Sequence, residues 1–130
     1  MYVLLDPKSN VPLYEQIIKQ VRERIVQGIV KPGEKVPSIR ELSAELAINP
    51  NTVSKAYKEL ERIGLFVTYR GKGTFINDEI DAVINEQDKE HIKSKLKEVV
   101  VDSIYAGITI RELNNWIEQY YRELGGISSD

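Results

Sequence analysis

Cysteine is missing from the 130-residue sequence, and histidine and methionine occur once each. Without cysteine the chain forms neither disulfides nor thiolate metal sites, a composition compatible with an intracellular protein. The lone histidine, His91, stands in a polar stretch and is interpreted as a surface residue. We therefore expect no metal site and no cofactor.

Long apolar runs are also missing. The N-terminus has no basic region followed by an apolar run, so it does not have the pattern of a secretory signal. The longest apolar patch, EVVVDSIYAGI, is too short to span a bilayer and contains Asp102. These features predict a soluble, cytoplasmic protein without a membrane partner.

Patterns typical of enzymes are missing as well. The sequence has no glycine-rich phosphate loop before a helix, no Ser/His/Asp set with a usable histidine, and no cluster of metal ligands. The acidic run between Asp78 and Glu90 lacks the loop pattern of a calcium site, so a solvated linker is the favoured interpretation. An enzyme is not expected.

Charge is distributed unevenly along the chain. Residues 1–77 hold 12 Lys/Arg and eight Asp/Glu, whereas residues 78–130 hold six and 12. A basic front half suits an anionic polymer, although chance patchiness explains the charge alone about as well. We predict one domain over residues 1–77, followed over residues 78–130 by an acidic linker and a two-helix tail.

The front half shows three helical patterns and then a hairpin pattern. Apolar spacing predicts helices over residues 13–27, from Ser38, and over residues 49–64, where Asn-Pro suits a helix start. Alternation in LFVTY, the turn RGKG and the segment TFI predict a β-hairpin with a basic tip. This order predicts a mostly α fold with a small β-hairpin: a winged helix-turn-helix followed by a C-terminal helical hairpin.

The outward face of the third predicted helix is polar and basic. The second helix of such a motif enters the major groove, where Asn, Ser and Lys can bond base edges or phosphates. Taken alone, a solvated face is the ordinary interpretation, but the neighbouring basic hairpin favours DNA. Arg40 points outward from the first turn of the second helix, where a phosphate or an ion pair with Glu41 or Glu45 would explain it.

The candidate DNA-contacting residues lie on the second helix, the third helix and the hairpin. They are Ser38, Arg40, Asn49, Asn51, Thr52, Ser54, Lys55, Lys58, Arg70, Gly71, Lys72, Gly73 and Thr74.

Two amphipathic helices are predicted in the tail, over residues 88–106 and from a Thr109–Glu112 capping box to about residue 124. Two such helices cannot bury their own apolar stripes, so we expect them to pair with a second copy of the chain. Packing on their own DNA-binding domain is the alternative. The expected dimerisation residues are Ile92, Leu96, Val99, Val100, Ile104, Leu113, Trp116, Ile117, Tyr120, Tyr121 and Leu124.

Residues 12–76 resemble the DNA-binding domain of the GntR family of bacterial transcription regulators, through PGEKVPSIREL, NPNTVSKAYKELE and GKGTF. The short tail is similar to that of the YtrA subfamily. The resemblance implies that Arg40, Asn51, Thr52 and residues 70–73 contact operator DNA. It also implies repression of a neighbouring transport operon by a homodimer on a pseudo-palindromic operator.

Some branches of the family have arginines where this chain has Pro50 and Ser54. Those contacts are not transferred, and the operator preference is expected to differ. No small-molecule effector can be named from the sequence. The competing hypothesis is a winged-helix module that binds another protein and has no specific DNA site.

Overall fold

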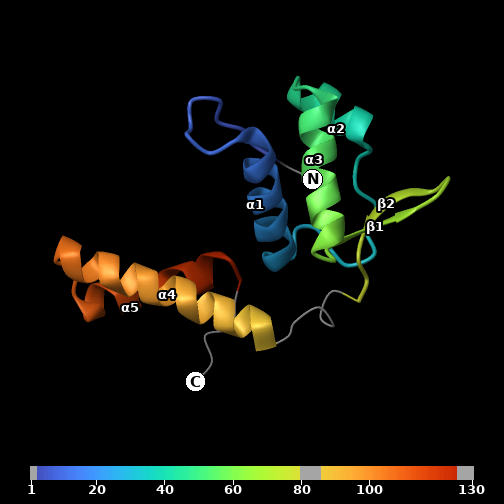
Figure 1. The fold of residues 1–130 in the computed structure, drawn as a ribbon. Helices are drawn as coiled ribbons and strands as arrows, with labels where there is room; N and C mark the ends of the chain where they lie inside the picture. The colour runs from blue at the N-terminus through green and yellow to red at the C-terminus, as the bar shows by residue number, and fades with distance from the viewer. Residues whose placement is uncertain (1–2, 80–85, 126–130) are drawn as a thin grey trace. The chain divides into compact units, whose positions relative to one another are not determined.

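The computed structural model describes residues 3–79 and 86–125 and divides into two compact units, Met1–Ala82 and Val83–Asp130 (Figure 1). Within the described ranges the first unit contains three helices and a two-stranded sheet, and the second contains two helices. The elements are α1 (Leu13–Val26), α2 (Ile39–Leu46), α3 (Pro50–Arg62), β1 (Phe66–Tyr69), β2 (Gly73–Ile76), α4 (Glu86–Ala106) and α5 (Ile110–Glu123).

The predicted caps of α2 and α3 are confirmed. Ser38 accepts a hydrogen bond from the backbone N–H of Glu41 at 3.0 Å, and the Glu41 carboxylate accepts one from the Ser38 N–H at 3.1 Å. The Asn49 side chain caps α3 by accepting the Asn51 N–H at 2.8 Å. Between the two helices Ala47 adopts a left-handed φ of 55°, which turns the chain from α2 into α3.

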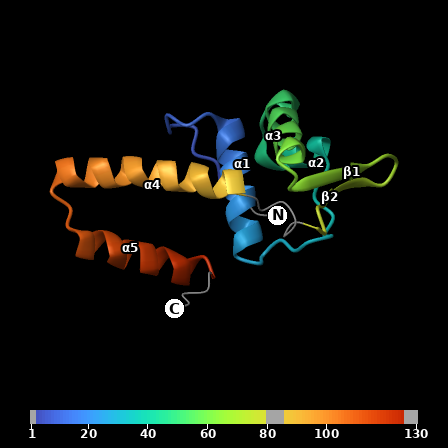
Figure 2. The same ribbon diagram turned by 60° about the horizontal axis from the view of Figure 1, so that its bottom comes forward.

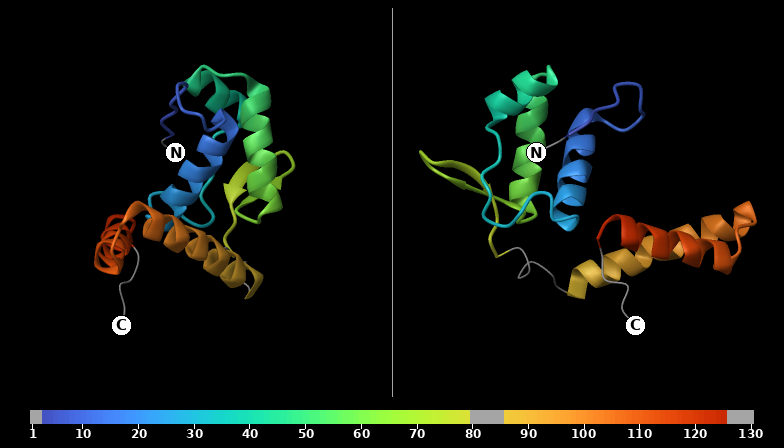
Figure 3. Two further views of the ribbon diagram at one scale, coloured as in Figure 1. Left: turned by 60° about the vertical axis from the view of Figure 1, so that its left-hand side comes forward. Right: turned by 180° about the vertical axis from the view of Figure 1, so that it is seen from behind.

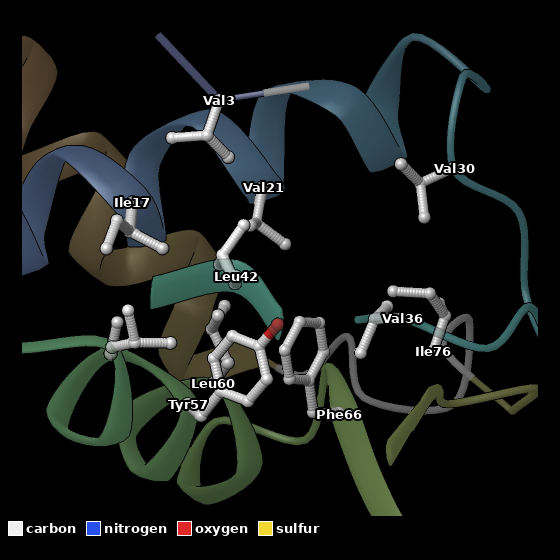
Figure 4. Close-up of a cluster of buried hydrophobic side chains, with 12 residues drawn as sticks. Val3, Ile17, Val21, Val30, Val36, Leu42, Tyr57, Leu60, Phe66 and Ile76 are labelled. Atoms are coloured by element: carbon white, nitrogen blue, oxygen red, sulfur yellow. The ribbon is translucent and has the colours of Figure 1, made fainter. Parts of the chain in front are cut away.

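One hydrophobic core holds the first unit together. It lies where α1, α2, α3 and the hairpin meet, and its side chains point toward one another in Figure 4. The buried apolar residues are Val3, Ile17, Val21, Val30, Val36, Leu42, Val53, Ala56, Tyr57, Leu60, Phe66 and Ile76. The apolar spacing that predicted the third helix is therefore confirmed, because Val53, Ala56, Tyr57 and Leu60 share its buried face.

Tyr57 connects α3 to the segment before α2. Its ring packs edge-on against Phe66 with centroids 5.0 Å apart, and its hydroxyl donates to the Pro37 carbonyl at 2.6 Å. Burial, with smaller contributions from Glu41 and Glu45, raises the pKa of the Tyr57 phenol well above its ordinary value. The neutral phenol therefore fixes the position of α3 relative to the start of α2.

The predicted hairpin is confirmed, and a third segment extends it. Strands β1 and β2 pair antiparallel with Phe66 opposite Ile76 and Tyr69 opposite Gly73. The connector before α2 then bonds the free edge of β2: Ile76 N–H donates to Glu34 at 2.8 Å and Val36 N–H donates to Thr74 at 2.9 Å. These bonds attach the base of the hairpin to the start of the helix-turn-helix.

The extended lead-in before α1 is held by two glutamine side chains. Gln16 accepts the Asp6 N–H at 2.9 Å and donates to the carbonyls of Asp6 and Val11, and it is itself buried. Gln20 accepts the Leu4 N–H at 2.7 Å. The lead-in is thereby fastened along α1 although it forms no regular element.

In the second unit, α4 and α5 run in opposite directions on either side of Gly107, which has a φ of 75° (Figure 2). The predicted capping box of α5 is only half right. Thr109 accepts the Glu112 N–H at 3.2 Å, but the Glu112 carboxylate bonds the Thr109 hydroxyl where a capping box requires the Thr109 backbone N–H.

The acidic linker lies largely outside the described residues, because residues 80–85 are not among them. Among the residues that are described, no helix is long and apolar enough to cross a membrane.

Candidate nucleic-acid interface

The candidate DNA-contacting residues all lie in the first unit. In Figures 1 and 2 the elements that contain them, α2, α3 and the hairpin, lie to the same side of α1. Asn51 and Lys58 are exposed on α3, whereas Thr52 and Ser54 are half-buried at the margins of that face. Polar side chains, exposed or half-buried, therefore follow the outer side of α3.

Two cations predicted on this face have partners within the protein. The Lys55 ammonium lies 3.9 Å from the centre of the Tyr14 ring, a cation–π contact that ties α3 to α1. Arg62 donates from Nε to Glu59 at 2.8 Å, and this pairing lowers the pKa of the Glu59 carboxyl. Lys58 thus remains as an exposed cation of α3 without a partner among the described residues.

Arg40 in α2 does not form the alternative ion pairs considered for it. Within the described structure neither Glu41 nor Glu45 lies within 4.0 Å of its guanidinium. The carboxylate of Glu41 is engaged by the Ser38 backbone and hydroxyl, and these bonds lower the pKa of Glu41. The side chain of Arg40 is exposed and available to a phosphate or a base.

Polar side chains that form the helix caps are less available. The Ser38 hydroxyl and the Asn49 side chain are both used in capping bonds to backbone N–H groups. Thr74 is also engaged, because its hydroxyl lies 3.0 Å from that of Thr68, which donates to Glu61 at 2.6 Å. For these three residues the structure shows a local role beside any contact with DNA.

The hairpin tip carries two exposed cations beside a left-handed glycine. Arg70 and Lys72 flank Gly71, which has a φ of 78° and open space where a β-carbon would lie. The turn is closed by the Lys72 N–H, which donates to Tyr69 at 2.9 Å. Figure 3 shows the hairpin extending away from the helices of its unit, as a wing that reaches an adjacent surface must.

Lys35 was missed by sequence reasoning. It lies in the connector beside β2, and a β-carbon built on Gly73 would come within 2.8 Å of its Cε atom. The residues PGEK precede the second predicted helix in the sequence, but no sequence signal places this connector on the edge of the hairpin. The structure thus adds a cation to the base of the wing.

Among the described residues the structure brings together no cluster of metal ligands, since no group of three or more potential ligands meets in residues 3–79 and 86–125. Two hollows flank the lead-in, with volumes of about 410 and 530 Å³. Both open to solvent.

Comparisons with known proteins identify the arrangement. Residues 13–76 match the family described as "Bacterial regulatory proteins, gntR family". The HTH-type transcriptional repressor YtrA of Bacillus subtilis is 45% identical over 124 residues, which cover 95% of each chain.

Two solved structures extend the similarity. A crystal structure described as a transcriptional antiterminator from Listeria monocytogenes has a TM-score of 0.88 at 38% identity and covers 100% of this chain and 98% of its own. The AraR(DBD) structure in complex with operator ORX1 has a TM-score of 0.50 at 31% identity and covers 56% of this chain and 90% of its own.

The family match and the 95% coverage of YtrA include the helix-turn-helix, the wing and the short tail together. The chain therefore belongs to the GntR family, in its YtrA-like subfamily, and is a transcription regulator and not an enzyme.

Proposed function

We propose that this regulator is a repressor that binds double-stranded operator DNA in the cytoplasm as a homodimer. The observation that supports DNA binding most directly is the set of exposed polar side chains on α2, α3 and the wing that have no partner in residues 3–79 and 86–125: Arg40, Asn51, Lys58, Arg70 and Lys72. Asn51 is assigned to a base edge, and the cations to phosphates or guanine. Two similar proteins support this proposal: YtrA is described as a transcriptional repressor, and the AraR domain is bound to an operator in its crystal structure.

The homodimer is inferred from the uncovered apolar faces of α4 and α5. Leu96 and Val99 are 46% and 45% exposed on α4, and Trp116 and Tyr120 are 42% and 59% exposed on α5. Large apolar side chains exposed in such number on two adjacent helices are typical of an interaction site in a folded protein. A second copy covers both faces with the same residues, and the resulting two-fold symmetry requires a pseudo-palindromic operator.

The test is a binding titration on a DNA duplex that the protein itself selects from a random pool. Specific binding is expected. The affinity should fall steeply between about 50 and 200 mM salt, because the release of counterions from the DNA contributes less free energy as the salt concentration rises. If selection enriches no sequence and the affinity at low salt is negligible, the protein-interaction module is the better assignment.

A further inference from the structure

Lys35 lies against the base of the wing without contributing to the core. Its Cε, Nζ and Cδ atoms lie 2.8, 3.5 and 3.9 Å from the position of a β-carbon on Gly73. The stem of the lysine therefore passes over the backbone where β2 begins, and glycine leaves room for it. The backbone of Lys35 is held in this position because Lys35 forms an isolated antiparallel β-bridge with Phe75 of β2.

The charge of Lys35 is not neutralised inside the protein. The residue is exposed, and no carboxylate lies within 4.0 Å of its ammonium in the described part of the chain. The charge of Lys35 makes a minor contribution to lowering the pKa of Glu41, but that carboxylate already accepts the Ser38 N–H. A solvated lysine held against a wing strand thus has its charge available to an external anion.

The position connects two elements that are assigned to DNA. Val36, next in the chain, donates to Thr74 of β2, and Ser38 two residues later begins α2 with its outward Arg40. A phosphate bound at Lys35 would therefore be held by a segment that is bonded to the wing and continuous with the helix-turn-helix.

We propose that Lys35 contacts a backbone phosphate of the operator at the base of the wing, an inference that rests on the proposed DNA-binding function. The ammonium positions the wing on the duplex and carries no sequence information of its own. The stem over Gly73 places the ammonium beside the start of β2.

The experiment compares full-length Lys35→Met, Lys35→Arg and Lys19→Met with the wild type by fluorescence anisotropy on the selected operator and on a scrambled duplex. Methionine keeps a stem of similar length without the charge, and arginine keeps the charge. Lys19 is an exposed lysine of α1 that serves as the matched control. Affinity is measured over a salt series from about 50 to 200 mM, and thermal unfolding checks each variant.

The slope of log affinity against log salt is negative, and Lys35→Met is expected to reduce its magnitude by about 0.9 for each chain bound. The reduction should be equal on both duplexes. Lys35→Arg and Lys19→Met should retain the wild-type slope. A wild-type slope for a folded Lys35→Met would overturn the phosphate contact while leaving operator binding intact. A wild type that binds neither duplex would overturn the proposed function and this contact together.

Discussion

At the scale of single residues, the start of α3 separates a capping role from a contact role. Asn49 uses its side chain to accept the Asn51 N–H, whereas the exposed side chain of Asn51 forms no such bond in the described structure. Asn49→Ala should therefore lower the stability of the fold by about 1 kcal/mol through the lost cap. Thermal or urea unfolding measures that effect.

Asn51→Ala should leave stability unchanged and weaken operator binding by about 1–3 kcal/mol, because a base-edge contact is lost. Repeating the sequence selection with the variant should show relaxed preference at one position of each half-site. If Asn49→Ala weakens binding and Asn51→Ala does not, the two roles are reversed and α3 is placed incorrectly in the groove.

Tyr57 allows a prediction for stability and pH. Tyr57→Phe should cost about 1–3 kcal/mol in the free energy of unfolding, because the Pro37 carbonyl loses its partner in a buried setting. The raised pKa of Tyr57 means that its contribution is complete below the unfolded value, near pH 10, and is lost as pH rises toward the folded value.

The difference between wild type and Tyr57→Phe should accordingly shrink above about pH 10, by up to roughly 1.4 kcal/mol per pH unit. Urea unfolding at several alkaline pH values measures it, with Tyr105→Phe as the control because Tyr105 is 88% exposed. A difference that is constant with pH would show that the phenol ionises equally in both states.

Residue patterns predicted the inner face of α3 and both caps of the helix-turn-helix, because these depend on neighbours along the chain. They did not predict that Lys55 lies on Tyr14 or that Arg62 pairs with Glu59. On a helical wheel all basic residues of the outer face look alike. Which of them have partners depends on the packing of α1 against α3 and on side-chain rotamers.

At the scale of elements, the wing depends on glycine at two positions for different reasons. Gly71 has a φ of 78° and open space where a β-carbon would lie, whereas Gly73 has a φ of 119° and Lys35 close to that position. Gly71→Ala should cost about 1–2 kcal/mol for the left-handed backbone alone. Gly73→Ala should cost more and should also displace Lys35, so that its salt slope falls like that of Lys35→Met.

Urea unfolding and the salt series together measure these effects. Equal destabilisation by both alanines, with both salt slopes unchanged, would mean that the lysine stem moves aside without consequence for the wing.

The hairpin itself was predictable from alternation and the RGKG turn, but its third segment was not. Residues 33–36 lack strand periodicity, and they pair with β2 because the chain must cross its edge between α1 and α2. The capping box of α5 was misjudged for a related reason. The Thr109–Glu112 spacing fits the motif, yet the carboxylate rotamer directs it to the hydroxyl.

At the scale of the whole molecule, most large apolar side chains of α4 and α5 are exposed, and no local pattern decides what covers them. Leu96→Glu changes a 46% exposed residue, so the fold of the single chain should be little affected. In a dimer the same position is buried twice by symmetry, and an unpaired carboxylate there costs several kcal/mol.

Light scattering should therefore give the mass of two chains for the wild type and of one chain for Leu96→Glu at equal concentration. The matched control is Lys97→Glu, which adds the same group at the neighbouring exposed position, turned 100° from Leu96 around the helix.

Operator affinity of Leu96→Glu should fall toward its non-specific value, because a single recognition helix contacts one half-site only. If Leu96→Glu remains a dimer, the interface lies elsewhere. If the wild type is already a monomer, each chain must bind DNA alone, and the operator need not be pseudo-palindromic.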